Sequence, residues 1–234
     1  MPTYDPILDT DIDAGQPLTK SLIEKLRNNP LALISAVPTE LTSSGTYTVP
    51  TGVTLLMVIC VGGGGSGGDQ YSPNLSGGSS GCVRCGFVTT TGGASISYTI
   101  GAGGTGGTPL GSGGNDGGDT VFDGSITGKG GRGGGKDPRV SQGAVNLGGA
   151  GGKEGEQRMV IGGTGGNAGT YGGGGGGAGV PWFLRTSSLG NGGNGGGGTG
   201  AGGNATGRGA GGGSGVLGGG NGSGGIIFVL PLQA

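Results

Sequence analysis

The amino-acid sequence predicts a mainly β and irregular fold. A short N-terminal helical segment is expected to precede a small β-sandwich-like base and a glycine-rich polyglycine II helix bundle. Of the 234 residues, 72 are glycine, and nearly all of these lie between Gly62 and Gly225. Apolar, strand-like blocks flank this glycine matrix on both sides. Only 30% of the residues are apolar, so backbone hydrogen bonds rather than a large hydrophobic core must order the chain.

Residues 1–41 carry helix signals and are predicted to be an attachment segment. Leu18, Leu22 and Leu26 recur at every fourth position with Ile23 beside them, and Asn28-Asn29-Pro30 is a stop signal. Such a short helix is marginal alone, since roughly 12–15 residues are needed for a stable isolated helix. We therefore expect these four side chains to bind a sister subunit or another protein. Packing against the chain's own β domain is the alternative.

The second predicted domain, residues 42–234, begins and ends with strands. The expected strands are Thr46–Val49, Val53–Val61, Ser95–Ile100, Thr120–Phe122 and Ile226–Leu230. Val53–Val61 is apolar on both faces, as is typical of a strand that is covered on both sides. Because the first and last of the long apolar strands must pair to be buried, we expect one sheet to pin both ends of the glycine matrix, residues 62–225.

The glycine matrix is predicted to form extended left-handed helices with three residues per turn and no internal hydrogen bonds. Without side chains, several such helices can pack together and hydrogen-bond to one another. Breaks in the glycine runs at 69–75, 136–140, 153–161 and 180–189 are expected to be loops at the ends of this bundle. A flexible glycine linker is the alternative interpretation. The strict every-third-residue period of collagen is absent.

Four stretches of sequence resemble the glycine-rich domains of bacteriophage tail appendages. They are Ser44–Val53 with the apolar run into Gly62–Gly65, Ser97–Gly104, Gly117–Phe122 and Gly222–Ile227. The leader Gly15–Ala32 is similar to one that often precedes such domains.

The resemblance implies a virion protein, commonly a tail fibre or fibre-tip adhesin, with polyglycine II packing. It also implies partners: other virion proteins through the N-terminal helix, a bacterial surface receptor (polysaccharide or outer-membrane protein), and a homotrimer. The short helix and the few aromatic residues in the loops depart from the fibre-tip adhesins. A purely structural virion component, such as a capsid decoration or a fibre connector, is the alternative. Ice binding by polyglycine helices is a third hypothesis, against which the irregular glycine spacing argues.

Composition argues against several functions. There is no histidine, which excludes Ser-His-Asp and Cys-His nucleophiles and histidine metal sites, so we expect no enzyme activity and no cofactor. The net charge of −1 gives no attraction to nucleic acid. The N-terminus lacks a signal segment, and no apolar run approaches the roughly 18 residues of a membrane span, so we expect a protein assembled in the host cytoplasm into a virion.

Four motifs with chemical potential have structural interpretations. Asp9–Lys20 and Gly113–Val121 resemble calcium loops, but the first lacks the required glycine and glutamate, and the second is a single copy of a repeat that needs several. We interpret the second as a glycine turn that enters a strand. Gly130–Lys136 matches a phosphate loop until Asp137 replaces the required Ser or Thr. Cys82-Val83-Arg84-Cys85 lacks a second pair for zinc and is placed between glycine turns, as reduced thiols or a local disulfide.

The candidate receptor-binding residues are Trp182, Phe183 and Arg185, with Tyr71 and Arg139 in two other expected loops. Exposed aromatic and arginine side chains are typical binding anchors, and a Trp face suits a sugar ring. The alternative is that the segment around Trp182 forms a small core at one end of the bundle. The basic residues between Lys129 and Arg158 are interpreted as a solvated loop set or as a weak site for phosphorylated polysaccharide.

Overall fold

The structure is a computed structural model that describes residues 20–26, 38–68, 77–107, 113–134, 160–162, 175, 179–181, 201–215 and 217–232. Residues 20–26 form a helix, and the described residues contain ten strands. The strands are β1 (Thr39–Leu41), β2 (Gly45–Thr48), β3 (Leu55–Val61), β4 (Val83–Thr89), β5 (Ser95–Thr99), β6 (Thr120–Phe122), β7 (Ile126–Gly128), β8 (Val160–Gly162), β9 (Gly179–Pro181) and β10 (Ile226–Leu232).

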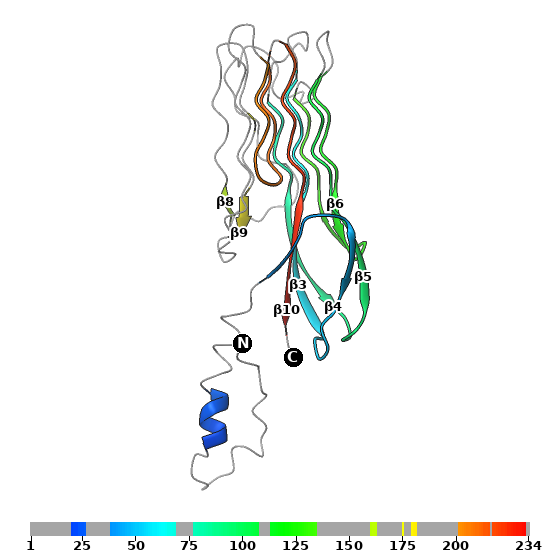
Figure 1. The fold of residues 1–234 in the computed structure, drawn as a ribbon, viewed down its shortest axis with the longest axis vertical. Coiled ribbons are helices and arrows are strands. Elements are labelled where there is room, and N and C mark those ends of the chain that lie inside the picture. The colour runs from blue at the N-terminus through cyan, green and yellow to red at the C-terminus, as the bar shows by residue number, and fades with distance from the viewer. Residues whose placement is uncertain are drawn as a thin grey trace.

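Two four-stranded antiparallel sheets make the base of the molecule (Figure 1). One has the strand order β1-β10-β3-β4, the other the order β2-β5-β6-β7, and β8 pairs with β9 separately. The predicted pairing of the long apolar strands is confirmed, because β10 lies against β3 from Ile226 opposite Val61 to Leu232 opposite Leu55. Both ends of the glycine matrix are therefore joined to neighbouring strands of one sheet.

The core lies between the two sheets. Leu56, Val58 and Cys60 of β3 point into it and are fully buried, and they meet Phe122 of β6 and Ile96 of β5 from the facing sheet. On the opposite face of β3, Ile59 and Val61 are buried with Ile226 and Phe228 of β10. The prediction that β3 is covered on both faces is thus confirmed for the half of the strand that adjoins the glycine segments.

Several strands were not predicted from the sequence. The placement of the Cys82–Cys85 motif between glycine turns is wrong, because β4 begins at Val83 and Cys85 lies opposite Ile59 of β3. Gly86 obscures this strand, and it packs closely against the facing sheet, where a Cβ would come within 2.8 Å of Ile126 Cδ1. Parts of two expected loops also pair, as β8 and β9.

Eight described segments outside the strands run alongside one another, and the seven of them other than residues 201–205 are here called the glycine array (Figure 1). They are residues 62–68, 77–82, 101–107, 113–119, 129–134, 209–215 and 217–225. Residues 62–68 lie at the centre, and all of them are buried. The motif 113–121 is therefore not a glycine turn, because its first seven residues form one of these segments before β6 begins.

The N–H groups of the central segment turn to three neighbours in rotation. The bonds run from Gly62 to Cys82, Gly63 to Gly118, Gly64 to Ser223, then Gly65 to Ser79, Ser66 to Asn115 and Gly67 to Gly220. Within each neighbouring segment, the residue number of the acceptor falls by three as the residue number of the donor rises by three. Residues 77–82, 113–119 and 217–225 are therefore antiparallel to the centre.

The carbonyl groups of the central segment turn to the other three neighbours in the same way. They accept from Gly131 at Gly63, Gly104 at Gly64, Gly212 at Gly65, Gly134 at Ser66, Gly107 at Gly67 and Gly215 at Gly68. Here the residue numbers of donor and acceptor rise together, so residues 101–107, 129–134 and 209–215 are parallel to the centre. The six outer segments also bond to one another and close a ring of alternating direction around residues 62–68.

Close approach rather than unusual backbone conformation requires glycine in the central segment. None of its glycines has a positive φ, unlike Gly124 in the β6–β7 turn at φ 63°. A Cβ on Gly65 would overlap the carbonyl group of Arg132, and a Cβ on Gly64 would overlap that of Ala210. Side chains are thus excluded from the centre because neighbouring backbones occupy the space.

Candidate functional site

The end of the array away from the sheets, here called the array tip, gathers the ends of the four segments that run away from the sheets. Hydrogen bonds place Gly107, Gly134 and Gly215 beside Gly67, Ser66 and Gly68 respectively. Residues 209–215 turn back at once, since Gly218 N donates to Gly215 O at 3.3 Å. After Gly68, Gly107 and Gly134 the chain continues into residues that the structure does not describe.

The predicted receptor-binding residues Trp182, Phe183, Arg185, Tyr71 and Arg139 lie outside the described residues. The nearest described element in the sequence is β9, which ends at Pro181, directly before Trp182. Its register with β8 places Val160 opposite Pro181. The assignment of these five side chains to a receptor contact stays a prediction.

Two of the four predicted attachment residues in the N-terminal helix are exposed to solvent. Ile23 is 51% exposed and Leu26 is 53% exposed, whereas Leu22 is buried and Leu18 lies outside the described residues. Ile23 and Leu26 are three positions apart and so lie on one side of the helix. The Lys20–Glu24 ion pair spans 3.9 Å at exposed positions and contributes little. In Figure 1 this helix lies beyond the sheets on the side away from the array.

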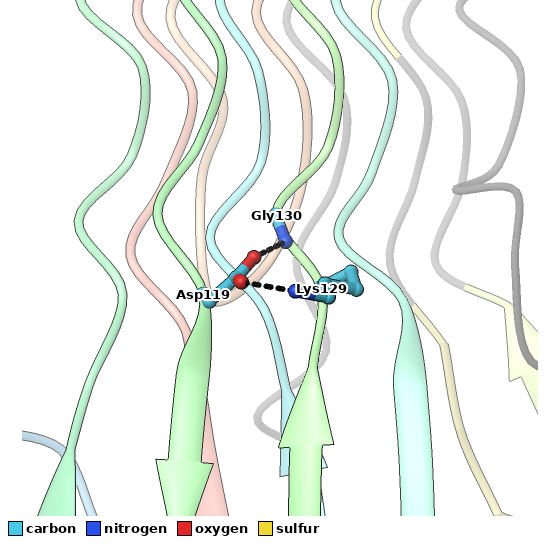
Figure 2. A network of polar contacts seen from close by, with 3 residues as sticks. All are labelled: Asp119, Lys129 and Gly130. Atoms are coloured by element: carbon cyan, nitrogen blue, oxygen red, sulfur yellow. Dashed lines mark hydrogen bonds and ion pairs between the residues drawn. The ribbon is translucent and has the colours of Figure 1, made fainter.

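A charged contact joins two array segments where they meet the sheets (Figure 2). Asp119, the last residue before β6, accepts a hydrogen bond from Lys129 Nζ at 2.7 Å through Oδ2. Its Oδ1 accepts the backbone N–H of Gly130 at 2.9 Å. The Lys129 hydrogen bond and that N–H hold the pKa of the Asp119 carboxyl below its usual value, against a smaller opposing effect of burial.

The same arrangement recurs three residues further along the array. Asp116 Oδ1 accepts the N–H of Gly133 at 2.8 Å, as Asp119 does for Gly130. In the resembled calcium loop these carboxylates would be ligands, but here they accept hydrogen bonds from the backbone of the neighbouring segment. This role was not predicted from the sequence, although the spacing of three between Asp116 and Asp119 is consistent with it.

Three cysteines are free thiols in the described structure. Cys60 is fully buried between the sheets, where its Sγ donates to Ile126 O at 3.5 Å, and burial raises its pKa to about 12. Cys85 is half-buried on the opposite face of the sheet, and burial raises its pKa too. The raised pKa values disfavour the thiolate, which is the reactive form, so these two side chains belong to the packing of β3 and β4.

Comparison with known families identifies the class of domain. No helix in the described part of the chain is long and apolar enough to cross a membrane, and no group of three potential metal ligands occurs there. No curated protein matches the sequence. Residues 39–230 match a family described as a glycine-rich domain, from the first residue of β1 to within β10. Since this match covers both sheets and the whole array, the chain belongs to the glycine-rich domain family.

Proposed function

We propose that the glycine array is a bundle of polyglycine II helices. The support is the threefold rotation of hydrogen bonds along residues 62–68, which a helix with three residues per turn produces. The absence of positive φ in this segment and the close approach of neighbouring backbones agree with that helix type.

We propose further that the protein is a bacteriophage virion component, a tail fibre or fibre-tip protein that attaches to the host surface without enzyme activity. The sequence stretches that resemble phage tail appendages lie where strands join the array. Ser97–Gly104 runs from β5 into the array, Gly117–Phe122 runs from the array into β6, and Gly222–Ile227 runs into β10. The resemblance therefore concerns the junctions that build this scaffold.

One observation carries the proposal: the array tip and the helix lie on opposite sides of the sheets (Figure 1). A backbone-bonded array tolerates changes at its tip because no side-chain core must be repacked. The exposed Ile23 and Leu26 suit attachment to another virion protein. The chain segments that follow the array tip would then face a bacterial polysaccharide or outer-membrane protein.

The test is adsorption of the fluorescently labelled full chain to a panel of whole bacterial cells. Wild type is compared with a Trp182→Ala/Arg185→Ala variant, and with an Ile23→Ser/Leu26→Ser variant as the matched control at the other end. Under the proposal wild type binds saturably, the first variant loses binding and the second retains it.

Other outcomes separate the alternatives. Binding that survives Trp182→Ala/Arg185→Ala keeps the adhesin and moves the contact to another segment, for example that of Tyr71 or Arg139. If folded wild type binds no cells of a panel that includes hosts of many phages, adhesion is rejected. A structural virion component, held through the helix, is then the better proposal.

A further inference from the structure

The outer segments of the glycine array have backbone N–H groups that point away from the centre. In residues 129–134, Gly131 and Gly134 donate to the central carbonyls of Gly63 and Ser66. Gly130 and Gly133 each precede one of these residues, so in the threefold rotation their N–H groups point a third of a turn away. In the central segment, every N–H group of residues 62–67 points at the backbone of a neighbouring segment. The N–H groups of Gly130 and Gly133 point at side chains instead.

Carboxylates accept these outward N–H groups. Gly130 donates to Asp119 Oδ1 and Gly133 to Asp116 Oδ1, at 2.9 and 2.8 Å. Both aspartates come from the neighbouring segment, residues 113–119, and both are exposed. Each carboxylate oxygen lies where the carbonyl oxygen of a further extended segment would otherwise accept the bond.

The outward side chains on this edge are also charged. Lys129 and Arg132 are exposed and three positions apart, so they share one side of their segment. Lys129 Nζ is held by Asp119 Oδ2. A chain that docked here would have to displace the two carboxylates and remove these charges from water, which is unfavourable. Exposed edges of β-sheets are protected by charges in the same way.

We propose that Asp116 and Asp119 terminate the glycine array at this edge. Their carboxylates occupy the acceptor positions of the next lattice segment and so prevent a glycine-rich segment of a second copy of the chain from extending the array. The inference rests on the hydrogen-bond pattern and on the charges of this edge, and it does not depend on host attachment.

The test is the self-association of the full chain, measured by sedimentation velocity over a wide concentration range. In an Asp116→Gly/Asp119→Gly variant the edge becomes flat and its two N–H groups lose their acceptors. We expect the dissociation constant for self-association to fall at least about tenfold below that of wild type, which corresponds to about 1.4 kcal/mol. Whatever oligomer the wild type forms under the same conditions is the reference.

Two controls isolate the cause. Asp123→Gly makes the same chemical change in the β6–β7 turn, where φ is 55° and glycine is tolerated, and it should leave self-association unchanged. Asp116→Asn/Asp119→Asn keeps an acceptor oxygen at each position and removes the charge, and it should associate much less strongly than the Gly variant. If the Asn variant associates as strongly as the Gly variant, charge rather than occupation of the acceptor positions protects the edge, and the proposal is wrong.

A folded Gly variant that sediments as wild type does would also overturn the proposal. If the double variant does not fold, Asp116→Gly alone serves, because Asp119 and Lys129 remain paired. In that variant the Gly133 amide should exchange with solvent faster than in wild type at low protein concentration and become protected as concentration rises. Fast exchange at every concentration would show that no second copy binds there.

Discussion

Gly65 shows at the scale of one residue why the array needs glycine. Its N–H donates to Ser79, its carbonyl accepts from Gly212, and the position of a Cβ is occupied by the backbone of Arg132. The neighbour that would have to move is itself hydrogen-bonded backbone, so it cannot yield as a flexible side chain would. Space, not conformational freedom, fixes the residue type here.

We predict that Gly65→Ala destabilises the protein by about 1–3 kcal/mol, the range of overpacked interiors. Gly224→Ala is the matched control, because a Cβ there would lie 3.6 Å from Gly101 O and 3.8 Å from Arg208 Nη1, which are ordinary contacts. It should change stability little, or raise it by about 0.4–1 kcal/mol through the unfolded chain. Thermal unfolding followed by calorimetry checks both. Equal losses for the two variants would contradict the packing argument.

The Asp119–Lys129 contact makes a pH-dependent contribution to stability. Because the folded-state pKa of Asp119 lies below its ordinary value of about 3.9, the contribution is present above that value and is lost as pH falls through the folded pKa. The Lys129 and Asp119 side chains are 58% and 41% exposed, so solvent screens the pair, and exposed pairs contribute roughly 0.2–1 kcal/mol.

We therefore predict that Asp119→Asn lowers stability slightly at pH 7 and by less at pH 2. Denaturant unfolding at low ionic strength, repeated between these pH values, measures the difference from wild type. Asp123→Asn is the control, since this exposed carboxylate makes no hydrogen bond among the described residues. A loss for Asp119→Asn that persists unchanged at pH 2 would point to a steric effect instead of the ion pair.

At the scale of the element, Ser66 interrupts an otherwise all-glycine central segment. Three residues after Asn115, Gly118 N donates to Ala102 O. The antiparallel register of the two segments therefore predicts a bond from Asn115 N to Thr105 O. The Ser66 hydroxyl is inserted there instead: it accepts from Asn115 N at 2.7 Å and donates to Thr105 O at 2.6 Å. A buried hydroxyl thus relays one bond of the array.

We predict that Ser66→Ala is more destabilising than Ser66→Gly. Alanine removes the hydroxyl but keeps a Cβ between the segments, so the Asn115 N–H is left without an acceptor, at a cost of about 1–3 kcal/mol. Glycine lets the two segments approach until Asn115 N donates directly to Thr105 O, as Gly118 N does to Ala102 O. This bond offsets part of the roughly 0.5–1 kcal/mol by which glycine disfavours folding. Denaturant midpoints of the two variants decide the order, and the reverse order would reject the relay.

A strand could be predicted from the sequence where its own residues carry the pattern, and not where it depends on a partner strand. The alternation in Ser95–Thr99 and the apolar run in Leu55–Val61 are local, and both strands form. Strand β4 could not be found, because Gly86 is explained only by Ile126 of the facing sheet. Strands β1 and β7 have three residues each and exist through their partners β10 and β6.

The candidate site was predictable to a different degree. Aromatic and arginine anchors such as Trp182 can be selected by residue type, but their assignment to a receptor contact stays a prediction. The edge residues Asp116 and Asp119 were misread as part of a turn, since their partners, Gly133 and Gly130, lie on another segment. Only the threefold period, which places both carboxylates on one side, connects sequence and structure there.

At the scale of the whole molecule, the array is a second core made of backbone. The two sheets bury apolar side chains, whereas residues 62–68 bury amides that bond to six surrounding segments. The six surrounding segments come from both halves of the described sequence. The central amides should therefore be released only when the array opens as a unit, as the most stable parts of a protein are.

We predict that the amide hydrogens of residues 62–67 exchange with solvent as slowly as those of β3, measured by NMR on the ¹⁵N-labelled chain. The amides of Ala102, Gly103 and Thr105, which have no acceptor among the described residues, should exchange orders of magnitude faster although they belong to the same array. Gly104, between them, donates to Gly64 and should be protected. This alternation within four residues separates a bonded array from a flexible glycine linker, in which all four amides would exchange at similar, fast rates.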